Sequence, residues 1–439
     1  MSKEEVKDLI KKKDVAFIQC WFTDMLGSLK SFAITPNELD EALEEGMGFD
    51  GSSITGFTRI EESDMIAKPD PKTFRILPWK SFESKTAMMF CDILNPDGTP
   101  FAGDPRHILK KAVGRARDLG YTYFVGPELE YFYFKSSEAP EIIDRAGYFD
   151  GLPTDLGEEV REKTIKALQS MGIVVEYSHH EVAPSQHEID LRFDEALAMA
   201  DKVMIYKTVV KEIAREHGLF ASFMPKPIFG ENGSGMHVHQ SLFCGEKNAF
   251  YELSDKYHLS TIARHYISGL LHHAPAITAV CNQWVNSYKR LVPGYEAPVY
   301  MAWARRNRSA LIRVPMYKPS KEKATRIELR SPDPSANPYL AFAVMLLAGL
   351  DGIEKKLAFT EPVEENIFKM SNDRKAEMGI NSLPGSLAEA IDSLRKDEII
   401  KTSLGDHLCT HFLNSKESEW DKYRIHVSQF EIERYLPML

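Results

Sequence analysis

The stretch GPELEYFYF, residues 126–134, decides the fold of this chain. Its residues alternate with a period of two, which predicts a β-strand with Glu128 and Glu130 on one face and Leu129 on the other. Aromatic residues at 131–134 indicate that both faces beyond the glutamates are buried. An isolated Glu-x-Glu pair usually marks a solvated strand face, but two carboxylates that enter a buried region need partners.

A second acidic stretch, HHEVAPSQHEI at 179–189, carries Glu181 and Glu188. Their spacing would suit one face of a helix, but Pro184 between them argues against a helix. Two strands joined at APSQ are the better interpretation. A structural role is the more frequent one for a lone histidine, so we do not interpret the histidines of this stretch as metal ligands: His179, His180 and His187.

The third stretch, NGSGMHVHQS at 232–241, opens with small residues and then alternates, which places His237 and His239 on one face. A His-x-His pair alone is a weak indication of zinc. The glycine-rich lead-in allows the backbone to approach a ligand closely, so Asn232 and Gly233 are expected to contact a substrate.

In the fourth stretch, TRIELRS at 325–331, Glu328 lies between Arg326 and Arg330 on one strand face. A surface strand with an ordinary ladder of ion pairs is the alternative. Further arginines upstream favour a site that captures phosphate or carboxylate in bidentate fashion: Arg290, Arg308 and Arg313.

Five carboxylates and one imidazole in a single cavity would require cations, and we expect these six residues to converge: Glu128, Glu130, Glu181, Glu188, His237 and Glu328. Oxygen-rich ligation favours Mg²⁺ or Mn²⁺, two or more per subunit, over zinc. With the arginines nearby, the pattern indicates phosphoryl chemistry with ATP as a substrate. A two-metal hydrolase would use the same ligands, and the residues alone do not separate the two.

Length and composition disfavour a nucleic-acid-binding, secreted or membrane-spanning protein. The chain has 439 residues, enough for two domains, and a net charge of −10 that disfavours nucleic acid as a partner. Its five cysteines are scattered, and its start is charged without an apolar signal region, so we expect a cytoplasmic location. The longest apolar run, 339–350, is too short to cross a membrane and predicts a buried helix.

Proline, glycine and aspartate concentrate at 95–105, so we predict a boundary between a small mixed α/β domain, 1–102, and a larger catalytic domain, 103–439. The fold class is α+β, with an antiparallel sheet whose inner face is polar, flanked by helices. Helices are expected at 3–13, 35–46, 107–120, 157–171, 194–217 and over much of the chain after 258; strands are expected within 15–34 and at 73–80, 86–94, 121–134, 173–182, 187–193, 219–224, 235–243 and 324–331. Residues 49–57 predict a loop.

Several longer motifs resemble those of glutamine synthetase, type I, of bacteria and archaea. They are FDGSSI at 49–54, NGSGMHVH at 232–239, KRLVPGYEAP at 289–298, RRNRSA at 305–310 and RIELRSPDPSANPYL at 326–340. The resemblance covers nearly the whole chain in the family's order. It implies a β-grasp-like amino-terminal domain and a catalytic domain with a curved antiparallel sheet. It also implies ATP-dependent ligation of ammonia to L-glutamate through a γ-glutamyl phosphate.

The same resemblance assigns the ligands and the substrate contacts. Glu130, Glu181 and Glu188 would hold one metal, and Glu128, His237 and Glu328 the other. The glutamate site would comprise Asn232, Gly233, Arg290, Glu296, Arg308 and Arg330. The ATP site would comprise Glu176, Phe193, His239, Ser241, Arg308, Arg313, Lys323 and Arg326, with Arg308 also catalytic at the γ-phosphoryl group.

By resemblance, Asp50, with Ser53 beside it, reaches the site from a neighbouring subunit, binds ammonium and takes its proton. For Asp50 alone, an ordinary turn aspartate is the alternative. Glu296 would be the carboxylate of a mobile loop that shields the intermediate. The family forms a dodecamer of two stacked hexamers, and residues 426–439 resemble the tail that inserts into the opposite ring. A helix packed on its own subunit is the alternative.

The segment EENIFKMSNDRK at 364–375 is short and lacks the tyrosine that is adenylylated in one branch of the family. The chain therefore resembles the shorter branch, which is controlled by feedback and by partners such as a PII-type nitrogen regulator. Arg59 matches an arginine linked to glutamine feedback, with an ion pair to Glu61 or Glu62 as the alternative. A γ-glutamyl ligase for another amine, such as a polyamine or ethanolamine, and a non-catalytic ring-forming homologue are the competing functions.

Overall fold

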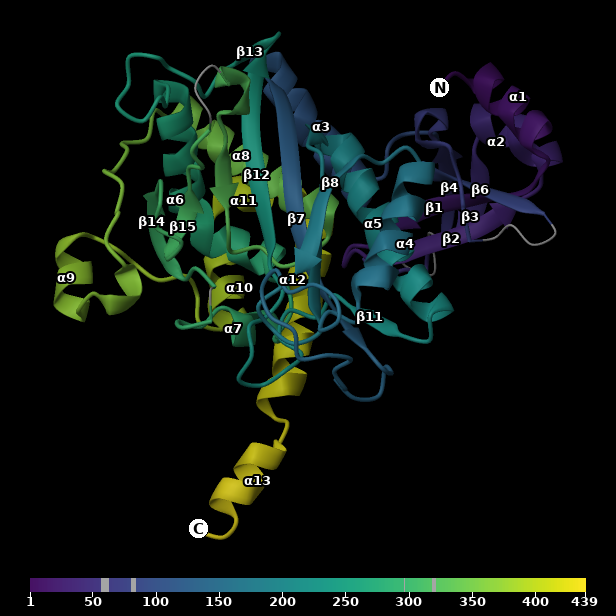
Figure 1. The fold of residues 1–439 in the computed structure, drawn as a ribbon. Helices are drawn as coiled ribbons and strands as arrows, with labels where there is room; N and C mark the ends of the chain where they lie inside the picture. Colours follow the sequence, from purple (N-terminus) through teal and green to yellow (C-terminus); the bar gives the residue numbers. More distant parts are fainter. Residues whose placement is uncertain (57–62, 80–83, 296, 318–320) are drawn as a thin grey trace.

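Two β-sheets organise the chain, a small one before residue 95 and a large one after residue 121 (Figure 1). The computed structural model describes residues 1–56, 63–79, 84–295, 297–317 and 321–439. The amino-terminal elements are α1 (Lys3–Lys13), β1 (Val15–Thr23), β2 (Leu29–Ile34), α2 (Leu39–Glu44), β3 (Met47–Asp50), β4 (Asp64–Pro69), β5 (Arg75–Ile76) and β6 (Lys85–Leu94).

The small sheet has the strand order β2-β1-β6-β4-β3, with β5 paired to β6. β1 and β6 run parallel and the other pairs are antiparallel. Val6 and Ile10 of α1 and Leu43 of α2 enter the apolar core of this sheet. Three predictions for this region were wrong. The strands β3 and β4 were not expected, and β3 includes the first two residues of the loop predicted at 49–57; the strand expected at 73–80 covers only two residues.

The large sheet begins the second part of the chain and is built around one long strand. Its strands and helices up to the middle of the chain are α3 (Pro105–Asp118), β7 (Thr122–Phe134), α4 (Glu158–Ser170), β8 (Val175–His180), β9 (Gln186–Leu191), β10 (Asp194–Glu195), α5 (Ala196–Glu216), β11 (Phe220–Ser222), β12 (Met236–Cys244) and β13 (Lys247–Asn248). The remaining ones are α6 (Thr261–Cys281), α7 (Ser287–Arg290), β14 (Tyr300–Ala304), β15 (Ala310–Arg313), β16 (Ile327–Leu329), α8 (Pro338–Glu354), α9 (Asn372–Glu377), α10 (Leu387–Lys396), α11 (Glu398–Leu404), α12 (Asp406–Arg424) and α13 (Gln429–Tyr435).

The order of the large sheet is β14-β15-β16-β12-β7-β9-β8, with β10 and β11 also paired to β7 and β13 to β12. All pairs are antiparallel except β14 with β15. Alternation along the strands turns Leu129, Val238 and Leu329 into the main apolar core. Their polar neighbours therefore face the other side of the sheet, and the predicted α+β class with its curled antiparallel sheet is confirmed.

Helices cover the apolar side of the sheet. The apolar run 339–350 lies inside α8, which is buried along almost its whole length, as predicted. Asn337 caps its start by accepting the backbone N–H of Tyr339, and Pro338 occupies its first turn. Over the described ranges, the helices are all too short or too polar to cross a membrane.

A buried arginine joins the two parts of the chain. Arg106, on α3, donates to Asp201 of α5 at 3.0 and 3.1 Å, to Asp92 of β6 at 2.6 Å and to Asp70 at 2.9 Å. Its side chain is only 3% exposed. The small sheet is thus tied to the helices of the second part by charge as well as by apolar packing.

The carboxyl-terminal helix α13 projects away from the rest of the molecule (Figure 1). Ser428 and Glu431 form a capping box at its start, which explains why a helix begins there. Its apolar residues are exposed in this single chain, including Phe430, Leu436 and Leu439.

Candidate active site

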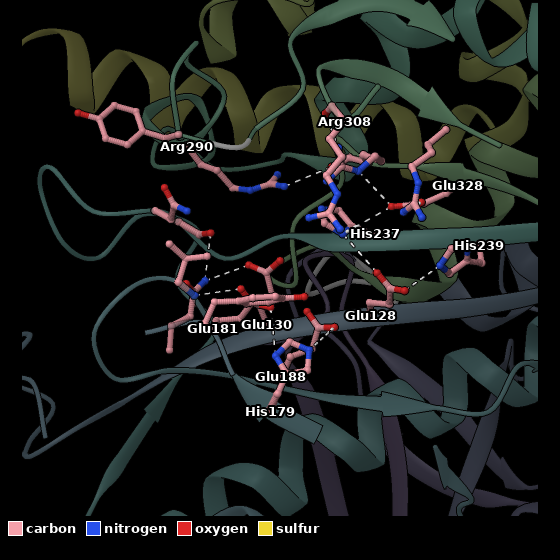
Figure 2. Close-up of a pocket in the computed structure, with 18 of the residues that line it drawn as sticks. Glu128, Glu130, His179, Glu181, Glu188, His237, His239, Arg290, Arg308 and Glu328 are labelled. Carbon is pink, nitrogen blue, oxygen red and sulfur yellow. Dashed lines mark hydrogen bonds and ion pairs between the residues drawn. The ribbon is translucent and has the colours of Figure 1, made fainter. Parts of the chain in front are cut away.

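Strand register places the predicted ligands beside one another. His237 of β12 lies opposite Glu128 of β7, and Glu130 of β7 lies opposite Glu188 of β9. Glu328 of β16 lies opposite His239 of β12. Each of these side chains is on the polar side of the sheet, so neighbouring strands present carboxylates and imidazoles together on one face (Figure 2).

These residues line a cavity of about 330 Å³. All six predicted metal ligands and most of the predicted arginines belong to its wall. The predicted residues along its wall are Glu128, Glu130, Glu181, Glu188, Asn232, Gly233, His237, His239, Arg290, Arg308, Arg313, Arg326, Glu328 and Arg330. The residues are far apart in sequence, and the sheet brings them together.

Two histidine rings contact the carboxylate of Glu128 on one side of the cavity. His239 Nε2 lies 2.8 Å from one oxygen of Glu128, and His237 Nδ1 lies 3.3 Å from the other. Arg326 donates to His239 Nδ1 at 3.2 Å, which leaves Nε2 as the nitrogen that donates to Glu128. Burial acts to raise the pKa of Glu128, but the two histidines hold this pKa well below its ordinary value.

Glu130 and Glu188 form the other side. Glu130 accepts hydrogen bonds from the side chain of Gln186 and from the backbone of Gly235, both at 2.9 Å. Burial raises the pKa of Glu130, and burial together with the neighbouring Asp190 and Glu130 raises the pKa of Glu188 well above its ordinary value. Acids in such an environment carry their full charge only when a cation compensates them.

A cation at each end fits the donors present. Two sets of three, Glu128 with His239 and Glu328, and His179 with Glu181 and Glu188, each offer ligand atoms within 4.8 Å of one another. Carboxylate oxygens dominate both sets, which suits Mg²⁺ or Mn²⁺. Sequence reasoning did not interpret His179 as a ligand, yet its ring lies between Glu181 and Glu188, at 3.5 and 3.7 Å.

A second cavity of about 250 Å³ adjoins the first and shares Glu128, Tyr177, His239 and Arg326 with it. The predicted nucleotide-binding residues also line it: Glu176, Phe193, Ser241 and Lys323. Phe193 is largely exposed, and its ring lies edge-on to Phe124. An exposed aromatic ring beside a cavity lined by carboxylates and arginines suits a nucleoside whose phosphates would reach that cavity together with cations.

Asp50 does not line either cavity within this chain. Asp50 ends β3 and is exposed, and the hydrogen bonds that it accepts from Ser52 lower its pKa. Arg59 and Glu296 lie outside the described residues.

Several lining residues were missed by sequence reasoning. They are Tyr148, Tyr177, His179, Val182, Gln186 and Tyr295. Tyr295 belongs to the KRLVPGYEAP motif, and His179, Val182 and Gln186 belong to the acidic stretch 179–189, so these four lie in segments that the sequence had singled out. Tyr148 and Tyr177 are aromatic side chains that a sequence presents equally often in an ordinary core.

Comparison with known proteins shows the family. A family model described as the glutamine synthetase catalytic domain matches residues 102–435, and one described as its β-grasp domain matches residues 14–96. Glutamine synthetase of Methanosarcina mazei is 53% identical over 442 residues, covering 100% of this chain and 98% of the relative. That of Thermotoga maritima is 51% identical over 440 residues, covering 99% of this chain and 100% of the relative.

Solved structures agree with the sequence relatives. The structure of a GmaS complex with ADP has a TM-score of 0.90 at 30% identity, covering 98% of this chain and 99% of that one. The cryo-electron microscopy structure of Plasmodium falciparum glutamine synthetase has a TM-score of 0.89 at 28% identity, covering 99% of each chain.

Proposed function

We infer that the acidic cavity is the ligation site of this chain, which belongs to the glutamine synthetase family and forms glutamine from glutamate and ammonia with ATP. The observation that carries this assignment is the convergence of six separated ligands beside a second cavity that suits a nucleoside. The other-amine ligase and the non-catalytic homologue are not favoured, because the relatives that share about half of this sequence are named glutamine synthetase.

We propose that Glu130, Glu181 and Glu188 hold one divalent cation and that Glu128, His237 and Glu328 hold another. Bound Mg²⁺ or Mn²⁺ would neutralise phosphate oxygens and polarise the transferred phosphoryl group. The buried Glu130 and Glu188 support the first assignment, since their environment disfavours their charge without a cation.

The arginines supply the positive charge for the substrates in this proposal. Arg308 and Arg313 face the γ-phosphoryl group, and Arg290 and Arg330, with Asn232 and Gly233, bind glutamate. Support for the glutamate site comes from the fixed position of Arg290, which donates to the backbone oxygens of Ser331 and Pro332 at 2.6 and 3.2 Å.

Ammonium needs a carboxylate to take its proton, and we propose that Asp50 of a neighbouring subunit has this role. Asp50 is exposed at the edge of the small sheet and is charged near neutral pH, since hydrogen bonds from Ser52 lower its pKa. A site completed across subunits requires a homo-oligomer, for which we propose two stacked hexamers. Glu296 would close over the acyl phosphate and exclude water.

We also propose the finer features that the family resemblance implied. The domain boundary lies between residues 102 and 103, the enzyme is cytoplasmic, and glutamine feedback acts through Arg59. A PII-type nitrogen regulator is the proposed partner. The five cysteines, all within the described ranges, are free thiols, which supports a reducing compartment.

A direct test measures glutamine and ADP formation by the purified chain with glutamate, ATP and Mg²⁺. Ammonia and ethanolamine serve as competing amines. The proposal expects ammonia-dependent glutamine formation that EDTA abolishes and Mg²⁺ or Mn²⁺ restores. Phosphate release with ethanolamine but not with ammonia would overturn it.

A further inference from the structure

Glu181 differs from the other proposed ligands in what carries it. Glu128, Glu130, Glu188, His237 and Glu328 all lie on strands of the large sheet. Glu181 instead lies in the connection of residues 181–185, between β8 and β9. The backbone N–H of Glu181 donates to the backbone oxygen of Gln186 at 2.7 Å, so strand pairing holds one side of this turn and the remainder needs support from another segment.

The support comes from Asp144, in the segment between β7 and α4. One oxygen of Asp144 accepts the backbone N–H of Ser185 at 3.0 Å and faces His180 Nε2 at 3.0 Å. The other ring nitrogen of His180 faces the backbone oxygen of Glu181 at 2.7 Å. His180 is fully buried and Asp144 nearly so. Asp144 therefore contacts one end of the turn directly, at Ser185, and reaches Glu181 at the other end through His180.

Ser185 ties the same two segments together in the opposite direction. Its hydroxyl oxygen accepts the backbone N–H groups of Ile143 and Asp144 at 2.7 and 3.2 Å. Ser185 is fully buried and has a φ of +62°, a left-handed conformation that a non-glycine residue adopts only when its surroundings enforce it. The turn is thus held in a strained shape by the segment behind it.

A structural metal site is the other use for this region, since Asp144, Asp155, His180 and His187 offer ligand atoms within 4.8 Å of one another. Arg161 already occupies the Asp155 side of the cluster. Its guanidinium lies 2.7 Å from Asp155 and 2.8 Å from His187 Nδ1. With a guanidinium supplying the positive charge, the cluster is a buried ion-pair network rather than a cation site.

We propose that Asp144 is a positioning residue, which fixes the turn 181–185 through His180 and Ser185 so that Glu181 reaches the cation shared with Glu130 and Glu188. The inference rests on the proposed function only in that Glu181 is a cation ligand. Asp144 would not touch substrate, and its effect would reach the reaction through Glu181 alone.

Titration of the full-length chain with Mn²⁺ alone, followed by electron paramagnetic resonance of the free ion, tests this role. Asp144→Asn keeps the shape of the side chain and should weaken one class of Mn²⁺ site by about 10- to 100-fold, the range seen when the support of a ligand is lost. Ser185→Ala should weaken the same class. ADP binding should be unchanged in both variants, because the nucleotide cavity lies on the Glu128 side.

Asp155→Asn is the matched control. It removes the carboxylate that pairs with Arg161 in the same buried network and does not contact the turn 181–185. It should lower the urea midpoint of unfolding and leave both classes of Mn²⁺ site intact. If Asp144→Asn does not fold, Ser185→Ala carries the test.

Two results would overturn the role of Asp144. One is wild-type Mn²⁺ affinity in Ser185→Ala and in any folded Asp144→Asn protein. The other is a loss of Mn²⁺ affinity in all three variants that follows their loss of stability. A wild-type chain that binds Mn²⁺ but makes no glutamine would overturn the proposed function instead, and would leave the positioning role standing.

Discussion

Arg313 donates a hydrogen bond to Glu328 across the strands β15 and β16, with 2.6 Å between guanidinium nitrogen and carboxylate oxygen. Arg330 approaches the other oxygen of Glu328 at 3.0 Å. Two guanidinium groups therefore balance a buried acid that we assign to a cation. A cation held by Glu328 would compete with both guanidinium groups for its oxygens and would leave them free for anionic substrate groups, so that cation and substrate binding would favour one another.

Glu328→Ala should abolish phosphoryl transfer, because it removes a cation ligand and leaves Arg313 and Arg330 without their acid. We expect at least a 100-fold loss of ADP release, on the order of a lost metal ligand or more. A coupled ADP assay with a Mg²⁺ titration measures it. Glu398→Ala, at an exposed ion pair with Lys401, should match the wild type. Near-normal turnover in Glu328→Ala would contradict the ligand assignment.

Asp50→Ala should lose most glutamine formation at low ammonium and recover part of it at high ammonium, since the carboxylate would bind and deprotonate that substrate. The initial rate against ammonium concentration measures this. Asp40→Ala, an exposed aspartate paired with Lys7, is the control.

The contribution of Asp50 across subunits can be tested by mixing. Asp50→Ala and Glu328→Ala subunits, dissociated and reassembled together, should regain activity, because some shared sites would combine an intact Asp50 with an intact Glu328. Mixtures that stay inactive, while reassembled wild type is active, would place each site within one chain.

Arg106→Ala should destabilise the chain by about 3–5 kcal/mol, because it leaves the buried Asp201 without its cation, whereas Asp92 keeps its ion pair with Lys110. The free energy of unfolding from urea titration measures the change. Arg115→Ala breaks an exposed pair with Glu354 and should change stability by less than about 0.5 kcal/mol. Equal effects of the two substitutions would refute the buried junction.

Stability should fall as pH rises above about 6.5 through the titration of His273. Burial of this ring acts to lower its pKa, but hydrogen bonds to Asp397 and Asp351, at 2.6 and 3.1 Å, raise the pKa above its ordinary value. The folded chain then holds the proton more tightly than the unfolded chain, so the stabilisation is present at low pH and lost above the folded pKa.

His273→Gln should reduce this slope by the contribution of His273 and lower stability at pH 6 by about 1–3 kcal/mol. The pKa values of His180 and Asp104 are also raised, so these two groups retain part of the slope. The neighbouring groups are His272, whose ring lies 4.8 Å away, and Lys355, which pairs with Asp351. His272→Gln is therefore the control, and it should retain most of the pH slope.

Much of the fold could be predicted from the periodicity of apolar residues and from the glycines and prolines that end helices and strands. The strand at 121–134 and the helix over 339–350 have patterns that only one kind of element satisfies. The strand β4, DMIAKP, could not be predicted, because its lysine, aspartate and proline disfavour a strand and its pairing with β3 and β6 overrides that preference.

The candidate site likewise contains residues that the sequence predicted and residues that it did not. The carboxylates and arginines could be predicted as site residues, because charged side chains at alternating positions of a buried strand need partners. Gln186 was missed, although its amide donates to Glu130, since a glutamine beside a turn has many ordinary roles. Asp144 was missed as well, because its partners lie 36 and 41 residues away and only the folded chain shows the contact.

The projecting helix α13 has a consequence for how the chain matures. A helix of seven residues, exposed along its described length, is too short to persist in water by itself. In the homo-oligomer that we propose, another chain would cover Phe430 and Leu436, so the order of this helix would depend on a concentration-dependent encounter between chains. Limited digestion near residue 427 would be rapid in newly made, dilute protein and slow once that encounter is complete. The rate at which a protease cleaves the tail would therefore report how far assembly has proceeded.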